Sequence, residues 1–195
     1  GTIVKIADPN LHLNVIISAP DPYFDNLWHI TNTGQCVTKG ILSTTGNGTS
    51  DADCDIEEAW GLGFSGLGIK VAVIDFVGFD TQHPDMISKF VNPWNTVNSS
   101  TDVAPPAGAL ESHAQNCSGL IAAIKDNGIG IAGVAYNSEI IPIKAGDQAS
   151  TATSVTISTA FQHARLYADI ISCSWFTPGF DATIANEIHL ARTTG

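Results

Sequence analysis

A short apolar run that ends at a carboxylate, Val71-Ala72-Val73-Ile74 followed by Asp75, constrains the fold of this chain more than any other feature. An unbroken run of this length is typical of a strand that is buried on both faces of a parallel sheet. Two further strands are expected at residues 139–144 and 169–174, and helices at 116–124, 155–167 and 183–192. This alternation predicts an α/β fold, a three-layer, open, mostly parallel twisted sheet with helices on both faces.

The rest of the chain carries weaker signals. Residues 1–20 contain an extended, β-branched pattern interrupted by Pro9. A loop is expected from Cys36 to Asp55, because this stretch is polar and contains Gly46-Asn47-Gly48. A second loop is expected at residues 92–112, which hold three prolines.

Charge limits the partners that the chain can bind. Its 195 residues include 8 Lys and Arg against 19 Asp and Glu, which gives a formal net charge of −11. An acidic surface repels phosphate backbones, so no nucleic-acid partner is expected, whereas calcium ions or basic partners suit it better. No apolar run approaches the roughly 20 residues of a membrane span, so none is predicted.

Candidate functional residues follow from the fold class, because open α/β sheets place their sites at the carboxyl ends of strands. Asp75 stands at such an end, and Ser174-Trp175-Phe176 stands at another. His113 lies where a long loop meets a helix of small residues. An Asp and a His that meet at this edge form the orienting half of a nucleophilic triad. The alternatives are a helix-capping Asp and a structural His.

The four cysteines leave several possibilities open. Cys36 and Cys54 are 18 positions apart in polar surroundings, where a disulfide between them is one possibility. Cys117 and Cys173 lie in apolar stretches and are expected to be buried free thiols. The alternative for Cys117 is a nucleophile beside His113, four residues before it.

Several motifs resemble those of one known family. Asp21-Pro22-Tyr23-Phe24, His83-Pro84-Asp85-Met86, the helix that opens at His113, and Ile171-Ser172-Cys173-Ser174-Trp175 occur in the order found in subtilisin-like serine peptidases. The closest resemblance is to the kexin/proprotein-convertase branch and its bacterial relatives. It implies that residues 21–195 are the N-terminal portion of a subtilisin-like catalytic domain. Residues 1–20 are then an extended N-terminal segment or a propeptide remnant.

The resemblance implies a secreted or extracytoplasmic serine endopeptidase that cleaves proteins or peptides. Asp75 and His113 correspond to the Asp and His of the Asp-His-Ser triad, and Ser174, Trp175 and Phe176 correspond to substrate-binding positions. In this family the oxyanion Asn and the nucleophilic Ser come later than Gly195. This fragment alone is therefore expected to be inactive and to need the downstream, serine-bearing part of the same precursor. The alternative is a catalytically impaired relative that acts as a binding or regulatory module.

The resemblance also implies a structural calcium site. Its ligands would be the side chains of Asp21, Asp85 and Asn127 together with three backbone carbonyls, those of Ile124, Ile129 and Ile131. Carboxylate and neutral oxygens are the ligands that calcium prefers. Ordinary turn-forming Asp and Asn residues are the alternative.

Departures from the family pattern concern substrate choice. Phe76-Val77-Gly78 follows Asp75 with one residue more than the family has, which predicts a bulge there, and Phe176 replaces a Gly. Acidic residues that would attract Lys or Arg are missing from both places, so an apolar or aromatic preference is expected. A dinucleotide-binding site at Gly61-Leu62-Gly63 is not expected, because these glycines precede the strand rather than follow it.

Overall fold

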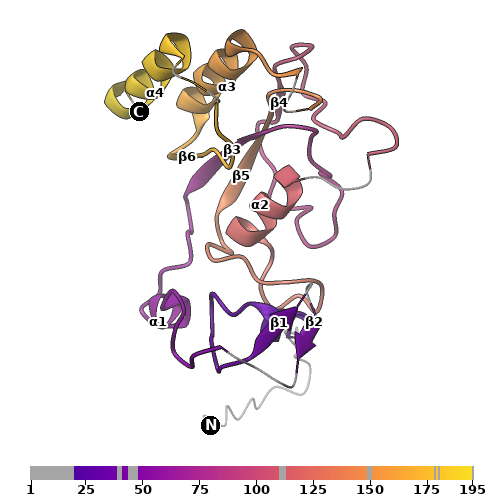
Figure 1. Ribbon diagram of the computed structural model, residues 1–195, viewed down its shortest axis with the longest axis vertical. Coiled ribbons are helices and arrows are strands. Elements are labelled where there is room, and N and C mark those ends of the chain that lie inside the picture. Colours follow the sequence, from indigo (N-terminus) through magenta and orange to yellow (C-terminus); the bar gives the residue numbers. More distant parts are fainter. Residues whose placement is uncertain are drawn as a thin grey trace, which may run out of the picture.

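The computed structural model describes residues 20–38, 41–43, 48–109, 113–148, 151–177, 179 and 181–194. The extended segment expected at residues 1–20 therefore lies almost entirely outside the described residues. Figure 1 shows the sheet and most helices in one part of the molecule, with the N-terminal elements below them.

A four-stranded parallel sheet forms the centre, as predicted. Its strands are β3 (Lys70–Asp75), β4 (Trp94–Asn95), β5 (Glu139–Lys144) and β6 (Ile170–Ser172), in the order β4-β5-β3-β6. The register of β3 and β5 places Asp75 opposite Lys144, and Val73 of β3 lies opposite Ser172 of β6. All four strands therefore end toward the same edge of the sheet.

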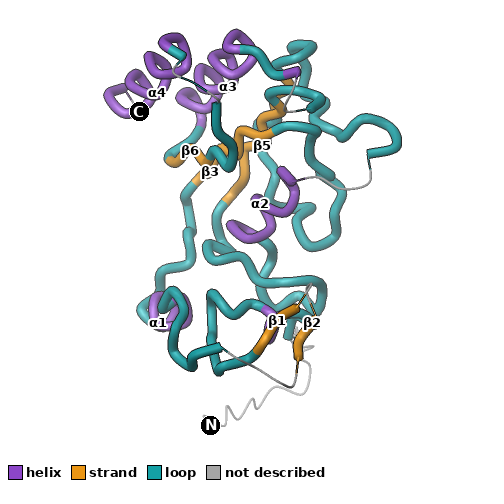
Figure 2. The backbone as a smooth tube through the Cα atoms, viewed as in Figure 1, coloured by secondary structure: helices purple, strands orange, loops and turns teal. Residues whose placement is uncertain are grey.

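The two faces of β3 are buried by different helices. Ala72 and Ile74 pack in one apolar cluster with residues of α3 (Ser154–Tyr167) and α4 (Ala182–Thr194). Val71 and Val73 pack on the opposite face in a cluster that includes α2 (His113–Ala122). Figure 2 shows the helices on either side of the strands. This arrangement confirms the predicted three layers, because the apolar run is buried on both sides.

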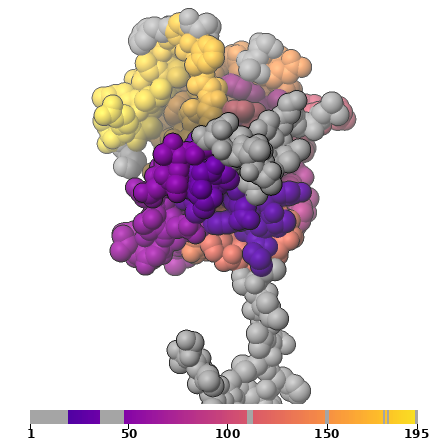
Figure 3. All heavy atoms as spheres, turned by 60° about the horizontal axis from the view of Figure 1, so that its bottom comes forward, coloured from indigo at the N-terminus to yellow at the C-terminus, as the bar shows by residue number. Residues whose placement is uncertain are grey.

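The N-terminal region packs against the loop that follows α2. It contains η1 (Phe24–Asn26), β1 (Cys36–Thr38), β2 (Ile41–Ser43) and α1 (Ile56–Gly61). Leu27 and Ile30 pack on Ala132 of that loop, and Tyr23 donates its backbone N–H to Gly130 O at 3.1 Å. Figure 3 views the molecule from this end, where the indigo and purple segments gather.

Three predictions of loops and boundaries were wrong. The stretch expected to be a loop from Cys36 to Asp55 contains the antiparallel pair β1–β2, and the loop expected at residues 92–112 contains β4. Strands of two or three residues are too short to show an alternating pattern, and pairing with a neighbour decides them. The helix expected at 116–124 begins at His113.

Candidate active site

Asp75 is the last residue of β3, and its side chain is only 2% exposed. Its Oδ2 lies 2.9 Å from Nδ1 of His113, and its Oδ1 accepts the backbone N–H of Phe76 at 2.7 Å. Burial raises the pKa of Asp75, and the Phe76 N–H and His113 oppose that rise. The carboxylate therefore depends on these two donors to remain ionised inside the protein.

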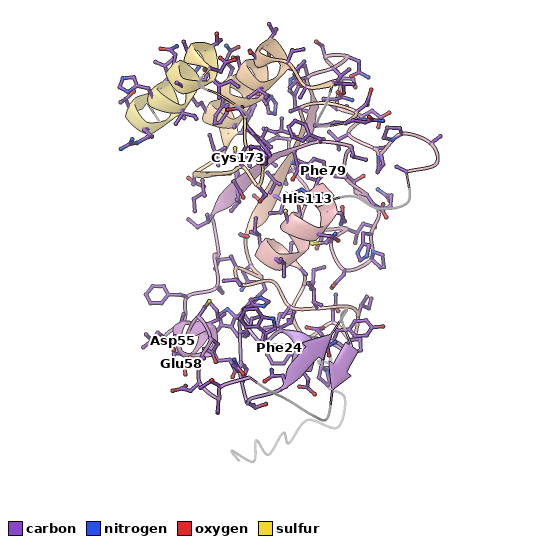
Figure 4. All side chains as sticks on the ribbon, in the orientation of Figure 1. Phe24, Asp55, Glu58, Phe79, His113 and Cys173 are labelled. Atoms are coloured by element: carbon purple, nitrogen blue, oxygen red, sulfur yellow. The ribbon has the colours of Figure 1, made fainter. Side chains whose placement is uncertain are left out.

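His113 is the first residue of α2, the helix that packs on the face of β3 formed by Val71 and Val73. Its side chain is 59% exposed, although its partner is buried. An ionised carboxylate only accepts hydrogen bonds, so Nδ1 carries a proton and donates it to Asp75. In the neutral imidazole Nε2 is then an acceptor, which can take a proton from a hydroxyl. Figure 4 labels His113 at the start of α2.

A tight turn accommodates the extra residue after Asp75. Val77 has a φ of 67°, and Gly78 donates its N–H to Phe76 O at 2.8 Å, which closes a three-residue turn. Gly78 has a φ of 129°, and a Cβ there would lie 2.4 Å from Val103 O. Only glycine therefore fits this position, and the turn holds Phe76 beside the carboxylate.

The segment after β6 forms the other wall of the site. Trp175 donates its Nε1–H to Ile74 O at 2.7 Å, and its ring centroid lies 5.8 Å from that of Phe76. A cavity of about 620 Å³ lies between these walls. It is lined by residues of β3, α2, α3 and the segment after β6, namely Asp75, Phe76, Val77, His113, Ala152, Ile157, Ser174, Trp175, Phe176 and Thr177. The structure thus brings together all five residues expected for catalysis and substrate binding.

The cysteines near the site differ from each other. Cys117 is half-buried, with Sγ 3.7 Å from Nε2 and 3.9 Å from Nδ1 of His113. One ligand atom each of Asp75, His113 and Cys117 lie within 4.8 Å of one another. Cys173 is exposed, so its expected burial was wrong, because β6 is at the edge of the sheet among the described strands.

Although Cys173 as a residue is exposed, nearby protein atoms partly desolvate its thiol. Desolvation by neighbouring protein atoms, assisted by the Asp75 charge, raises the pKa of Cys173 to about 12. A neutral thiol is a poor nucleophile and a poor metal ligand. Cys54 is a free, exposed thiol. The side chain of Cys36 lies outside the described residues, so the possible disulfide between the two stays a prediction.

Lys144 is a buried charged residue next to the site that the sequence reasoning did not single out. It ends β5 opposite Asp75 and is buried. Its Nζ donates to Ala104 O at 3.1 Å and pairs with Asp147 at 2.7 Å. Lys144 stands at the carboxyl end of a strand, where sites of this fold class lie. The sequence did not select it, because a Lys at the end of an apolar run is equally typical of a strand end exposed to solvent.

Asp21 and Asp85, two of the residues expected to bind calcium, contact one loop, residues 124–131. Asp21 and Asp85 are 5% and 2% exposed, and none of the ion pairs in the described part of the chain includes either. Asp21 accepts the N–H groups of Asp126 and Asn127, and Asp85 accepts Asn127 Nδ2 and the Ile131 N–H, all at 2.9–3.0 Å.

The backbone on both sides of that loop is tied to Asp85. Ile124 donates its N–H to Asp85 O at 3.0 Å, and the Ile129 N–H binds Asn127 Oδ1 at 2.8 Å. A Cβ at Gly130 would lie 2.2 Å from Asp85 Oδ2. Among the described residues neither carboxylate has a basic partner, and backbone N–H groups do not neutralise their charge, which is the situation that a divalent cation suits. The contacts that Ile124, Ile129 and Ile131 make here use their N–H groups rather than the carbonyl oxygens expected as ligands, and Asn127 turns its amide NH2 toward Asp85.

Two further expectations concern the dinucleotide fingerprint and the membrane. Gly61-Leu62-Gly63 ends α1 and precedes β3, so it does not open a helix after a strand. Among the described helices, none is both long enough and apolar enough to cross a membrane.

Known proteins match this chain in sequence and in fold. The model of the subtilase family matches residues 66–194. Neuroendocrine convertase 2 of Homo sapiens is 32% identical over 163 residues, which is 82% of this chain and 24% of that protein. The Caenorhabditis elegans protein of the same name is 31% identical over 166 residues, 83% of this chain and 24% of its own length. The chain thus spans about a quarter of the length of these relatives.

Solved structures share the fold. The Aeromonas sobria serine protease, solved with its chaperone, has a TM-score of 0.73 at 24% identity, over 88% of this chain and 29% of that chain. A protease of Pseudoalteromonas arctica has a TM-score of 0.70 at 22% identity, over 91% and 57% of the two chains. These matches confirm the subtilisin-like α/β fold. Since the family model matches all four strands of the parallel sheet and both residues of the Asp75–His113 pair, the chain belongs to the subtilase family.

Proposed function

We propose that this chain supplies the Asp and His of the Asp-His-Ser site of a serine endopeptidase. The observation that carries the proposal is the 2.9 Å contact between Asp75 and His113 at the edge of a 620 Å³ cavity. A buried carboxylate that orients an exposed imidazole is the arrangement by which triads activate a hydroxyl.

In the mechanism, Asp75 keeps the proton of His113 on Nδ1. His113 Nε2 accepts the proton of the serine hydroxyl while that oxygen attacks the peptide carbonyl carbon. The Asp75 charge stabilises the imidazolium that forms. The imidazolium then donates its Nε2 proton to the leaving amine, and the acyl-enzyme remains for water to hydrolyse.

The serine is proposed to come from a downstream segment of the same precursor, and this chain alone is proposed to be inactive. Two observations support this. The human relative is about three and a half times as long as this chain, and β6 lacks a neighbour on its outer edge among the described strands. An unpaired strand edge is a ready site for a further strand.

The test compares residues 1–195 alone with the complete protein, using a fluorophosphonate that labels activated serines. We expect labelling and peptide hydrolysis only in the complete protein, and loss of both in His113→Ala. Labelling that persists in His113→Ala would contradict the proposal. Peptide binding without labelling in the wild type would instead favour a non-catalytic binding module, which the exposed Phe176 at the cleft allows.

We also propose that the loop of residues 124–131, with Asp21 and Asp85, holds a structural calcium ion. The support is the pair of buried carboxylates without a basic partner described above. When bound, the ion neutralises their charge, and these residues join the N-terminal region to the loop after α2. We further propose a secreted or extracytoplasmic location, where calcium is abundant enough for sites of moderate affinity. Fractionation of the native source with an antibody against this chain tests that location.

A further inference from the structure

We infer that the cleft beside His113 selects a large apolar side chain of the substrate and disfavours Lys and Arg. This inference rests on the proposed function and adds the substrate class. Its basis is the wall formed by Phe76, Trp175 and Phe176, here called the aromatic wall.

The aromatic wall is attached directly to the catalytic carboxylate. Trp175 binds the carbonyl of Ile74, the residue before Asp75, and its ring packs on Phe76, the residue after Asp75, at an interplanar angle of 51°. Trp175 is half-buried, whereas Phe176 is 88% exposed. An exposed apolar side chain in a cleft is covered when an apolar ligand binds, and burial of that surface is favourable.

The turn after Asp75 holds Phe76 in this place. Val77 adopts a left-handed conformation that β-branched residues rarely take, and its N–H binds Gly146 O at 2.9 Å. Strained backbone of this kind persists only where its surroundings determine it, and it concentrates at functional sites. These two hydrogen bonds of the turn, from Val77 to Gly146 and from Gly78 to Phe76, fix the backbone that carries Phe76 beside Asp75.

A basic side chain finds no available carboxylate at the aromatic wall. Asp75 is the only acidic residue among the described residues that line the cavity, and both of its oxygens are bonded. Asp181, the next acidic residue along this segment, binds Ser154 Oγ and the N–H groups of Thr183 and Ile184. It therefore caps α4 instead of facing a substrate.

Asp147, which follows β5, is also engaged. Asp147 pairs with the buried Lys144, which lies opposite Asp75 in the sheet. An ammonium or guanidinium group placed against the aromatic wall would lose water without gaining a partner, which is unfavourable. Attraction between aromatic faces and a cation offsets only part of this loss.

The experiment uses the complete protein and a peptide library randomised at each of the four positions before the cleaved bond. We expect at least one position where Phe or Leu exceeds both Lys and Arg at least tenfold in kcat/KM. Phe76→Asp should reverse that preference toward Arg, because it places a carboxylate on the wall. Phe64→Asp is the matched control, since Phe64 is an exposed phenylalanine outside the cavity, and it should leave the profile unchanged.

A second variant covers the case in which Phe76→Asp does not fold, and a binding measurement covers the case in which no peptide is cleaved. If Phe76→Asp melts early, Phe176→Asp replaces it, because Phe176 is exposed and contributes little to the core. Affinities of amide-capped, uncleavable peptides are measured by tryptophan fluorescence. If no peptide is cleaved, the proposed function fails, but tighter binding of the Phe peptide than of the Lys peptide still supports this inference. A preference for Lys or Arg, or none for apolar residues at any position, overturns it.

Discussion

Asp75 and His113 share a 2.9 Å contact, yet one side chain is 2% exposed and the other 59%. The carboxylate lies at the end of a strand that is covered on both faces, and the imidazole projects from the first turn of a helix on one of those faces. A shielded carboxylate holds its hydrogen bond without competition from water, while the outer edge of the imidazole remains accessible to a reactant.

Replacement of the imidazole tests its role as a base. We expect His113→Ala to lower the kcat of the complete protein by about four to six orders of magnitude, because no other group takes the hydroxyl proton. His189→Ala is the control, since His189 is an exposed histidine of α4. Equal activity in His113→Ala and His189→Ala would refute the assignment.

Asp75→Asn separates activity from stability. We expect kcat to fall by about 10⁴, because the amide does not hold the correct tautomer. The raised pKa of Asp75 means that the folded state binds a proton more readily than the unfolded state, whose value is near 3.8. The free energy of unfolding therefore falls as pH rises from that value through the folded pKa, and the wild type stays less stable above it.

Asn has no charge to bury. The free energy of unfolding of Asp75→Asn, measured relative to that of the wild type, should therefore be higher at pH 7 than below pH 3.8. Thermal denaturation across this range measures the difference. Asp53→Asn should show the opposite sign, because the N–H groups of Asp55 and Asn32 lower the pKa of Asp53. A pH-independent difference for Asp75→Asn would show that burial does not disfavour its charge.

Calcium removal tests the proposed metal site. A ligand that binds only the folded state at 100 times its Kd adds about 2.7 kcal/mol to the free energy of unfolding. We therefore expect EGTA to lower the Tm of the wild type but to have little effect on Asp85→Asn. Asp80→Asn, on an exposed loop residue, should respond to EGTA as the wild type does. An unchanged wild-type Tm would rule out a structural calcium ion here.

Cys117 should make the site sensitive to zinc. A Zn²⁺ ion bound by the Cys117 thiolate and His113 Nε2 would block the base. Histidines that bind zinc through one ring nitrogen commonly donate the N–H of the other to a carboxylate, and Asp75 accepts from Nδ1 in this way. We expect Cys117→Ser to raise the inhibitory Zn²⁺ concentration at least tenfold. Cys173→Ser is the control, since the pKa of Cys173 is about 12. Equal inhibition of all three proteins would argue against this contact.

The turn after Asp75 should tolerate only glycine at position 78. We expect Gly78→Ala to lower the free energy of unfolding by about 1–3 kcal/mol, because its Cβ would lie 2.4 Å from Val103 O at a φ of 129°. Gly61→Ala in α1, where nothing lies within 4 Å of the added Cβ, should be neutral or stabilising. Chemical denaturation of both variants measures this difference, and equal stability would show that the turn is not constrained.

Local patterns in the sequence determined the interior of the fold. The strands β3 and β5 were predicted within one residue, because burial on two faces leaves a continuous apolar run in the sequence. The bounds of α3 were also predicted within one residue. The strand-end rule selected Asp75, and the small residues after His113 selected its helix. These are properties of residues within a few positions of one another.

Tertiary structure alone decided which distant residues meet. The 38 positions between Asp75 and His113, and the 101 between Ile74 and Trp175, are spanned only when β3, α2 and β6 pack. Asp181 lies six positions after Trp175 in the sequence, and only the structure shows that its carboxylate caps α4. The local pattern of apolar residues predicts which residues are buried. A contact between two distant side chains depends on how separate elements pack, and no local pattern predicts that.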